Sequence, residues 1–325
     1  MKKVLLAIFV MVSFSYASKQ EVTVSVLPQK YFVEKIAGDK VHVNVMVKPG
    51  FSPATYAPKT SQMKKLAKSK IYFAIDVPFE DVWLDKFKNS NKDMLIVDTA
   101  KNIVKLEMEE HSHHEEDGKE EDHEEHDEHH DEKNEHHDKH DDDHEEKDKH
   151  DDHDEDEKHH DEHEGLDPHI WTDPLIVKIQ AKNILNALLQ IDAKNSDYYK
   201  KNYINFMIEL DVLNKKLETI LKPYANNAFM VFHPSWGYFA KRYNLEQVTI
   251  ESEGKEPKPN ELIELIKDAK EHKIKIIFVS PQFSQNSAKV IAKSINGKVI
   301  SIDHLSLDWN NNLIKTAQVI ANTYK

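Results

Sequence analysis

The chain has 325 residues, with 44 Lys and Arg, 58 Asp and Glu, 21 His and no cysteine. Without cysteine it has no disulfide framework and no cysteine that could carry a lipid. The negative charge is local: the tract 109–164 holds 31 acidic residues and 6 lysines, which leaves 38 basic and 27 acidic residues elsewhere. The basic residues are spread evenly, so the composition speaks against nucleic acid as a partner.

The first 17 residues have the pattern of a secretory signal peptide. Two lysines precede an uninterrupted apolar run at 4–12, and the small residues at 15–17 suit signal peptidase. This run is too short to cross a bilayer, which takes about twenty residues. We therefore expect export to the periplasm and a mature protein that begins near Ser18.

Between residues 18 and 173, strand and helix signals alternate, which is typical of parallel α/β architecture. The proline-rich segment 49–58 suits neither and predicts a loop. The predicted strands are 22–27, 41–47, 71–75 and 94–97, and the predicted helices are 29–37, 60–68 and 80–88. These elements predict an N-terminal lobe, 18–173, built on a parallel sheet.

The tract 109–164 is inserted near the end of this lobe. Its 56 residues include 16 histidines, and only Ser112, Gly118 and Asn134 are neither histidine, acidic nor lysine. Imidazoles and carboxylates bind zinc, copper or nickel. No aliphatic or aromatic side chain falls in the tract, so nothing offsets the entropy of ordering its backbone. We expect a disordered loop that gathers metal ions, and a solvated acidic spacer is the alternative.

A helical region, 174–223, follows the tract. Residues 175–189 have helical spacing, and a longer helix at 196–222 starts with Ser196, which can serve as its N-cap. Apolar residues step by three and four along about 26 residues of this helix, which is roughly 39 Å at the helical rise. A helix of this length can cross from one domain to another before Pro223 ends it.

The rest of the chain, 224–325, repeats the alternation and predicts a second small α/β lobe. Its predicted strands are 228–232, 247–250, 274–279 and 298–302, and its predicted helices are 235–243, 259–272, 284–295 and 309–324. The natural ligand position in such a protein is the crevice between the lobes, outside the carboxyl ends of the strands.

Three residues outside the tract stand where this crevice can use them. His169 lies in a proline-stiffened loop before a helix, and His233 and Asp303 each follow a predicted strand. Two imidazoles and a carboxylate suit zinc, whose ligands lie at ~2.0 to 2.2 Å in a tetrahedron. A histidine after a strand is otherwise a structural cap. His304, beside Asp303, is either an outer partner of this site or a surface residue.

The segments around these residues resemble the metal-binding solute-binding proteins of ABC importers, cluster A-I, and most of all their high-affinity zinc-uptake members. The motifs, in the expected order, are PGFSPATYAP at 49–58, DPHIWTDP at 167–174, FHPSWGYFAKRY at 232–243, ESEGKEPKP at 251–259, SPQFS at 280–284 and IDHL at 302–305. The resemblance implies two α/β lobes joined by one long rigid helix, with a metal site in the cleft. It also implies that His169, His233 and Asp303 fall on metal ligands of the family.

Two positions depart from the family pattern. Ala54 stands where the family has a further histidine ligand, and its methyl group cannot coordinate a metal. The fourth position is then open to Tyr56 in the same loop, to water or to a histidine of the tract. Tyr56 is our first candidate, and packing at the cleft wall is its alternative role. Ser280 stands where the family often has a glutamate, which makes the site less anionic and disfavours manganese.

The resemblance implies a periplasmic carrier, a monomer and not an enzyme, which binds Zn2+ as its transported ligand and delivers it to the permease of an ABC transporter. Imidazole ligands favour zinc but also suit nickel, copper and iron. The tract would collect further metal ions. A zinc-dependent hydrolase is one alternative, although no helical His-Glu-x-x-His motif or nucleophile elbow is present. A periplasmic zinc buffer or adhesin without a permease is the other.

Overall fold

The computed structural model describes residues 19–108, 165–251 and 255–325, which belong to one compact unit. The predicted signal segment, 1–17, and the tract 109–164 lie outside these ranges. No helix in the described part of the chain is both long and apolar enough to cross a membrane.

The first lobe is built on a four-stranded parallel sheet in the order β2-β1-β3-β4. Its strands are β1 (Gln20–Val24), β2 (Val41–Val45), β3 (Ile71–Ala74) and β4 (Leu95–Asp98), and its helices are α1 (Leu27–Ala37), α2 (Thr60–Leu66) and α3 (Phe79–Ser90). All four residues of β3 are buried, because helices cover both faces of a parallel sheet.

The first helix starts earlier than the sequence pattern predicts. Leu27, expected to end a strand, is the first residue of α1. The side-chain oxygen of Gln29 accepts the backbone N–H groups of Ser25 and Val26 at 2.9 and 3.2 Å. This cap satisfies donors that precede the first helical turn and so moves the strand–helix boundary toward the N-terminus.

The second lobe repeats the arrangement with the order β6-β5-β7-β8, again all parallel. Its strands are β5 (Ala228–Val231), β6 (Glu246–Thr249), β7 (Ile276–Val279) and β8 (Lys298–Ser301), and its helices are α6 (Gly237–Arg242), α7 (Pro259–Glu271), α8 (Asn286–Ser294) and α9 (Trp309–Thr323). In both sheets the strand order reverses between the two central strands, and the carboxyl ends of those strands are where ligands bind in open α/β sheets.

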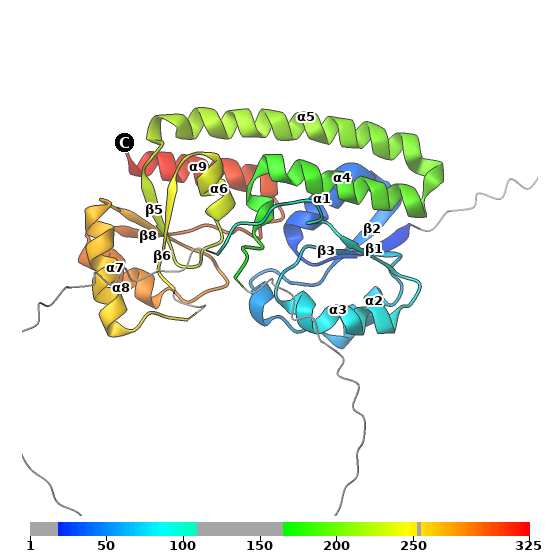
Figure 1. Cartoon of the computed structure of the whole chain (residues 1–325), viewed down its shortest axis with the longest axis horizontal. Helices are drawn as coiled ribbons and strands as arrows, with labels where there is room; N and C mark the ends of the chain where they lie inside the picture. The colour runs from blue at the N-terminus through cyan, green and yellow to red at the C-terminus, as the bar shows by residue number, and fades with distance from the viewer. Residues whose placement is uncertain (1–18, 109–164, 252–254) are drawn as a thin grey trace, which may run out of the picture. The chain divides into compact units, whose positions relative to one another are not determined.

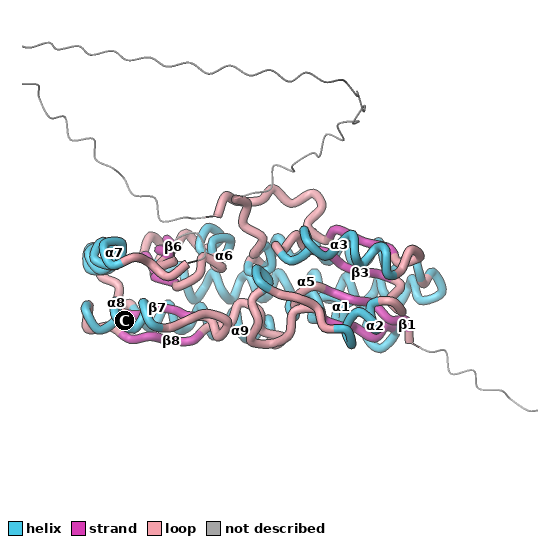
Figure 2. Tube along the Cα trace, turned by 90° about the horizontal axis from the view of Figure 1, so that it is seen from below, coloured by secondary structure: helices cyan, strands magenta, loops and turns pink. Residues whose placement is uncertain are grey.

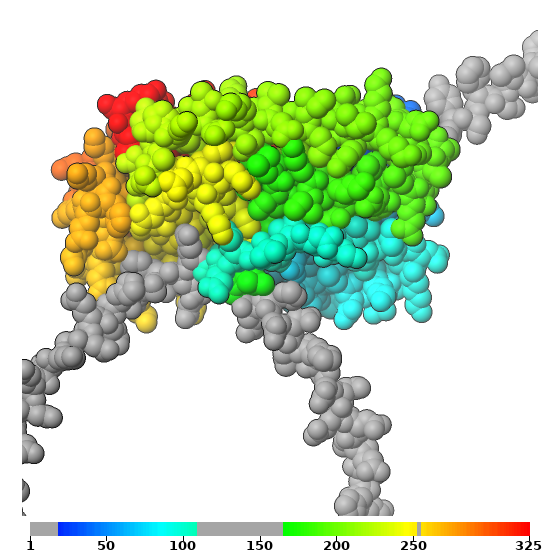
Figure 3. All heavy atoms as spheres, turned by 45° about the horizontal axis from the view of Figure 1, so that its top comes forward, coloured from blue at the N-terminus to red at the C-terminus, as the bar shows by residue number. Residues whose placement is uncertain are grey.

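Two helices, α4 (Pro174–Ile191) and α5 (Ser196–Leu221), connect the lobes. α5 packs against α1 and α4 of the first half and against α9 of the second half, as Figures 1 and 2 show. Its buried side chains lie on one face, as the spacing predicts: Tyr199, Phe206, Leu210, Leu213, Leu217 and Leu221. In the space-filling view the outer face of α5 (yellow-green) is exposed along the upper edge (Figure 3).

The aromatic residues at the start of α9 join the two halves. Trp309 is buried, and its ring packs edge-on against Phe32 of α1, with 4.9 Å between the ring centroids. One hydrophobic core therefore includes residues of both lobes. The predicted α/β fold with two parallel sheets and a long helix is confirmed, while the exact domain boundaries at 173 and 223 stay predictions.

A buried carboxylate closes the carboxyl ends of β1 and β3. Glu80 is 1% exposed and accepts hydrogen bonds from Ser25 Oγ and from the backbone N–H groups of Ile75 and Asp76. The hydroxyl of Tyr72 lies 3.5 Å from Glu80 Oε1. Burial is the main reason that the pKa of Glu80 rises to about 7.

We expect Glu80→Gln to flatten the pH dependence of stability. Folded Glu80 keeps its proton up to about pH 7, whereas the unfolded residue releases it near 4.5. This contribution to stability is therefore full below about pH 4.5 and is lost as the pH rises through 7. The difference between wild type and variant should change by roughly 3 kcal/mol at most, at about 1.4 kcal/mol per pKa unit. Urea unfolding between pH 5 and 8 measures it, and parallel curves for both proteins would contradict the prediction.

Candidate metal centre

The segment from Gly165 to Pro174 leads from the tract into α4 and carries the first histidine. Its start is paired with residues 106–108: Met108 N–H donates to Gly165 O at 2.7 Å, and Asp167 N–H donates to Leu106 O at 2.8 Å. Its end is the N-cap of α4, where Asp173 accepts the N–H of Leu175 at 2.7 Å. Backbone hydrogen bonds thus fix the start of the segment, and a side-chain cap fixes its end.

Side chains of the second lobe hold the same segment. Tyr238 OH donates to Asp167 O and Trp309 Nε1 donates to Trp171 O, each at 2.8 Å. Arg242 Nε donates to Asp173 Oδ2 at 2.7 Å. At Gly237 a Cβ atom would lie 3.0 Å from Asp167 Oδ2, so glycine lets α6 approach this carboxylate.

His169 is held by the carboxylate two residues before it. His169 is 4% exposed, and its Nδ1 lies 2.7 Å from Asp167 Oδ1, which also accepts the backbone N–H of His169 at 2.8 Å. Burial lowers the pKa of His169 well below 6.5, and nearby His233 lowers it further. A neutral ring that donates Nδ1–H to Asp167 keeps Nε2 as an acceptor for a metal.

Opposing effects act on the pKa of Asp167. Burial raises its pKa to about 7, against the hydrogen bond from His169 N–H and the positive charge of Lys105. Lys105 itself is paired with Asp76 of the first lobe. A cation bound at His169 would favour the ionised form of Asp167, because an opposite charge nearby lowers a carboxyl pKa.

His233 follows β5 at the point where the order of the second sheet reverses. Its Nδ1 lies 2.6 Å from Glu251 Oε1, and Glu251 follows the neighbouring strand β6. The ring stacks on Phe283 with centroids 4.4 Å apart. Like His169, His233 therefore has a carboxylate at Nδ1 and keeps Nε2 for a metal.

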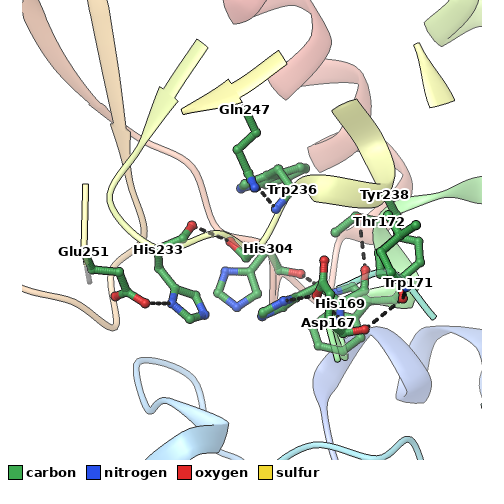
Figure 4. A network of polar contacts seen from close by, with 12 residues as sticks. Asp167, His169, Trp171, Thr172, His233, Trp236, Tyr238, Gln247, Glu251 and His304 are labelled. Atoms are coloured by element: carbon green, nitrogen blue, oxygen red, sulfur yellow. Dashed lines mark hydrogen bonds and ion pairs between the residues drawn. The ribbon is translucent and has the colours of Figure 1, made fainter. Parts of the chain in front are cut away.

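The structure brings His169 and His233 together, as Figure 4 shows: their ring centroids are 5.1 Å apart. A carboxylate behind each imidazole is the usual environment of a zinc-bound histidine. Among the described residues, no group of three or more histidine, aspartate or glutamate side chains is already arranged to hold a metal ion. Capture of a metal would therefore need a small rearrangement of further ligands toward the two histidines.

Asp303 follows β8 and lies in a hydrogen-bonded loop. Its Oδ1 accepts from Gln282 Nε2 at 2.9 Å and from Leu305 N–H at 3.0 Å. No described contact joins this carboxylate to His169 or His233, so its role as a ligand stays a prediction. Its second oxygen is the atom that a metal would use.

Tyr56 is buried in the first-lobe loop, and its hydroxyl donates to Gln62 Oε1 at 2.8 Å. Its ring packs against Phe51 and Phe79 with centroids 5.8 and 6.0 Å away. Burial raises the pKa of Tyr56, which works against the phenolate form that binds metals. These contacts favour the packing role, and Tyr56 as the fourth ligand stays a prediction. Ala54 is exposed.

The sequence pattern left His304 as either an outer partner or a surface residue, and the surface alternative is wrong. His304 is 3% exposed, and its ring centroid lies 5.2 Å from that of His169 and 6.1 Å from that of His233. Burial and the two neighbouring histidines lower its pKa well below 6.5.

The carboxylate partners Asp167 and Glu251 were not among the predicted site residues. Asp167 had a local signal, because an aspartate two residues before a histidine can accept its backbone N–H. Glu251 follows β6 as His233 follows β5, and parallel neighbours end at the same edge of a sheet.

Two lobes with parallel sheets, a long helix across them and two adjacent histidines define a metal-binding solute-binding protein of cluster A-I. A family model described as "ZnuA: Zinc-uptake complex component A periplasmic" matches residues 22–323. The chain therefore belongs to this family.

Individual relatives agree with this assignment. The high-affinity zinc uptake system protein ZnuA of Bacillus subtilis is 34% identical over 135 residues, which are 41% of this chain and 42% of that protein. The zinc-binding protein AdcA of Streptococcus pyogenes serotype M3 is 25% identical over 291 residues, 88% of this chain and 50% of that protein. The chain thus spans half or less of the length of these two relatives.

Solved structures match along almost the whole chain. A crystal structure of ZnuA has a TM-score of 0.76 at 37% identity and covers 95% of this chain and 100% of its own. A 138-173 ZnuA deletion mutant with zinc bound has a TM-score of 0.75 at 37% identity, covering 94% and 98%.

We expect Asp167→Asn to weaken zinc binding by about 10–100-fold, the usual effect of losing a partner behind a metal-bound histidine. The amide can donate to His169 Nδ1 and so favour the wrong tautomer, with the proton on Nε2. Competition with a chromophoric chelator gives the affinity, and 15N NMR of the imidazoles gives the tautomer. Glu246→Gln is the matched control, because Glu246 pairs with the exposed His272 at 3.3 Å. Equal effects of both changes would contradict the prediction.

Proposed function

We propose that this protein is the solute-binding component of a zinc ABC importer. It binds Zn2+ in the periplasm as its transported ligand and delivers the ion to a membrane permease. The first 17 residues direct its export, and it works as a monomer. The ligands are His169 and His233, with Asp303 and, as first candidate for a fourth position, Tyr56.

The observation that carries this proposal is the histidine pair. Two imidazoles from separate parts of the chain lie 5.1 Å apart, and each has a carboxylate at Nδ1. Imidazole ligands suit zinc, and the two carboxylates offset the charge of the ion without binding it directly. Relatives that are named for zinc uptake and a similar structure with zinc bound support the choice of zinc.

The arrangement of the two histidines and their carboxylates does not favour a zinc-dependent hydrolase. A zinc-dependent hydrolase needs a general base beside the metal-bound water. The carboxylates nearest the two histidines, Asp167 and Glu251, hold Nδ1 on the side of each ring away from a metal at Nε2. A carrier needs only to bind its metal ion and release it, and this arrangement suits both steps. Hydrolysis by the zinc-loaded protein would favour the enzyme instead.

We expect His233→Gln to abolish the tightest zinc site of the mature protein and to leave the weaker sites unchanged. The variant removes a ligand nitrogen, whereas the control His272→Gln removes an exposed imidazole. Competition titration with zinc gives affinity and stoichiometry for both. A tight site that survives in His233→Gln would contradict the proposed site. Poor growth in zinc-depleted medium without the gene, restored by wild type and not by His233→Gln, separates a carrier from a zinc buffer.

The tract 109–164 acts in this proposal as an auxiliary collector of metal, with many weak sites that raise the local zinc concentration. The described residues on either side of the tract are paired with each other. Glu107 and Leu166 pair as an antiparallel bridge, and Met108 N–H donates to Gly165 O at 2.7 Å. The backbone is thus closed at the base of the tract, so the tract can be removed without separating these two segments.

We expect replacement of residues 109–164 by Asn-Gly to keep the tight site and to remove most of the weak ones. Asn-Gly suits the two-residue hairpin that would join Met108 to Gly165. Wild-type tract sites should lose zinc between about pH 7 and 5, because an unperturbed imidazole has a pKa of about 6.5. The tight site should hold zinc to lower pH, since burial lowers the pKa of His169. Calorimetry measures both, and loss of the tight site with the tract would contradict this division of roles.

A further inference from the structure

The loop after β8 places a third histidine ring beside the pair. His304 is 3% exposed, and its ring centroid lies 5.2 Å from His169 and 6.1 Å from His233. Figure 4 shows the three rings next to one another, carried by three separate segments of the chain. We propose that His304 is a zinc ligand and supplies the third imidazole of the site.

The spacing of the rings fits a shared metal. A zinc-bound imidazole has its centroid roughly 3.2 Å from the ion, so two tetrahedral imidazoles have centroids roughly 5.2 Å apart. The pair His169–His233 at 5.1 Å and the pair His169–His304 at 5.2 Å have this separation. The pair His233–His304 at 6.1 Å is wider. A small inward shift of one of these two rings would complete the set around His169.

Hydrogen bonds orient His304 as they orient the other two rings. Its Nδ1 lies 3.2 Å from Ser280 Oγ, and the serine hydroxyl can accept the Nδ1–H. Nε2 is then free of a proton and available to a metal. The backbone oxygen of His304 accepts Trp171 Nε1–H at 2.8 Å, and the ring stacks on that indole at an interplanar angle of 20°. The loop and the ring are therefore positioned before a metal arrives.

The first-lobe loop does not offer a nitrogen in this chain. Ala54 has no donor atom, and the hydroxyl of Tyr56 is used by Gln62 at 2.8 Å. An aromatic ring without nitrogen would fill the space against Trp171 equally well and would avoid burying a polar group. Metal binding through Nε2 explains why a histidine is buried here with its Nδ1 hydrogen-bonded to Ser280. With the carboxylate of Asp303, the site becomes a set of three imidazoles and one oxygen, in which His304 takes the fourth position in place of Tyr56.

This inference rests on the proposed function, and X-ray absorption at the zinc edge separates the two. The mature wild-type protein is loaded with less than one equivalent of zinc, so that the tightest site fills first. We expect the spectrum to fit three imidazoles, and two imidazoles in His304→Phe, which keeps a ring against Trp171. Zinc affinity should fall in His304→Phe by more than the roughly 10–100-fold typical of an outer partner. His272→Gln, which removes an exposed imidazole outside the site, is the control and should leave both readouts unchanged.

Each outcome decides one question. Tight binding with two imidazoles in wild type, and unchanged affinity in His304→Phe, would overturn the role of His304 and leave the carrier function standing. Absence of tight zinc binding in wild type would instead overturn the proposed function. The imidazole count of wild type decides the inference even if the phenylalanine variant folds poorly, and His304→Gln is a second variant for the affinity measurement.

Discussion

The candidate site depends on holding the imidazoles of His169 and His233 in the correct tautomer where the two lobes meet. A metal needs a neutral ring with an accepting nitrogen, and burial, together with nearby His233, lowers the pKa of His169 well below 6.5. Burial cannot choose the tautomer, so a hydrogen bond at Nδ1 must do so. Asp167 does this for His169, and Glu251 does it for His233. The packing of Tyr238, Trp309 and Arg242 on the segment 165–174 holds Asp167 in register with the second lobe.

The same arrangement would suit the proposed carrier, which must also release its ion. The carboxylates stand behind the rings, so they contribute attraction through the imidazoles and not as direct ligands. Asp167 has a pKa of about 7 through burial, and Lys105 supplies a positive charge nearby. A cation bound at His169 would favour the ionised form of Asp167, because an opposite charge nearby lowers a carboxyl pKa. A site with permanently ionised direct ligands would hold the ion more strongly and return it less easily.

Much of the fold and part of the site follow from local patterns in the chain. The three-and-four spacing along α5 requires one buried face, and the apolar run at β7 requires a strand covered on both sides. The predicted start of a helix was wrong where a side chain caps it, as Gln29 does at the start of α1. The position of His304 depends on Trp171, 133 residues away in sequence. No periodicity reports such a contact, because it is set by how the chain packs in three dimensions. Asp167 could have been found from its spacing to His169, and Glu251 from the shared edge of two neighbouring strands.

The two sheets have the same strand order and use it differently. In the second sheet, His233 occupies the carboxyl end of β5, where the order reverses and ligands bind. The equivalent place in the first sheet is filled by Glu80, which accepts hydrogen bonds from Ser25 and from backbone N–H groups after β3. Because that edge is closed, the first lobe cannot present a ligand from its own central strands. Its proposed ligands lie on chain that leaves the sheet: His169 in the segment 165–174 and, as first candidate for the fourth position, Tyr56 in the loop after β2. The proposed metal centre is asymmetric for this reason, because the second lobe offers His233 directly after a strand and also holds the segment that carries His169.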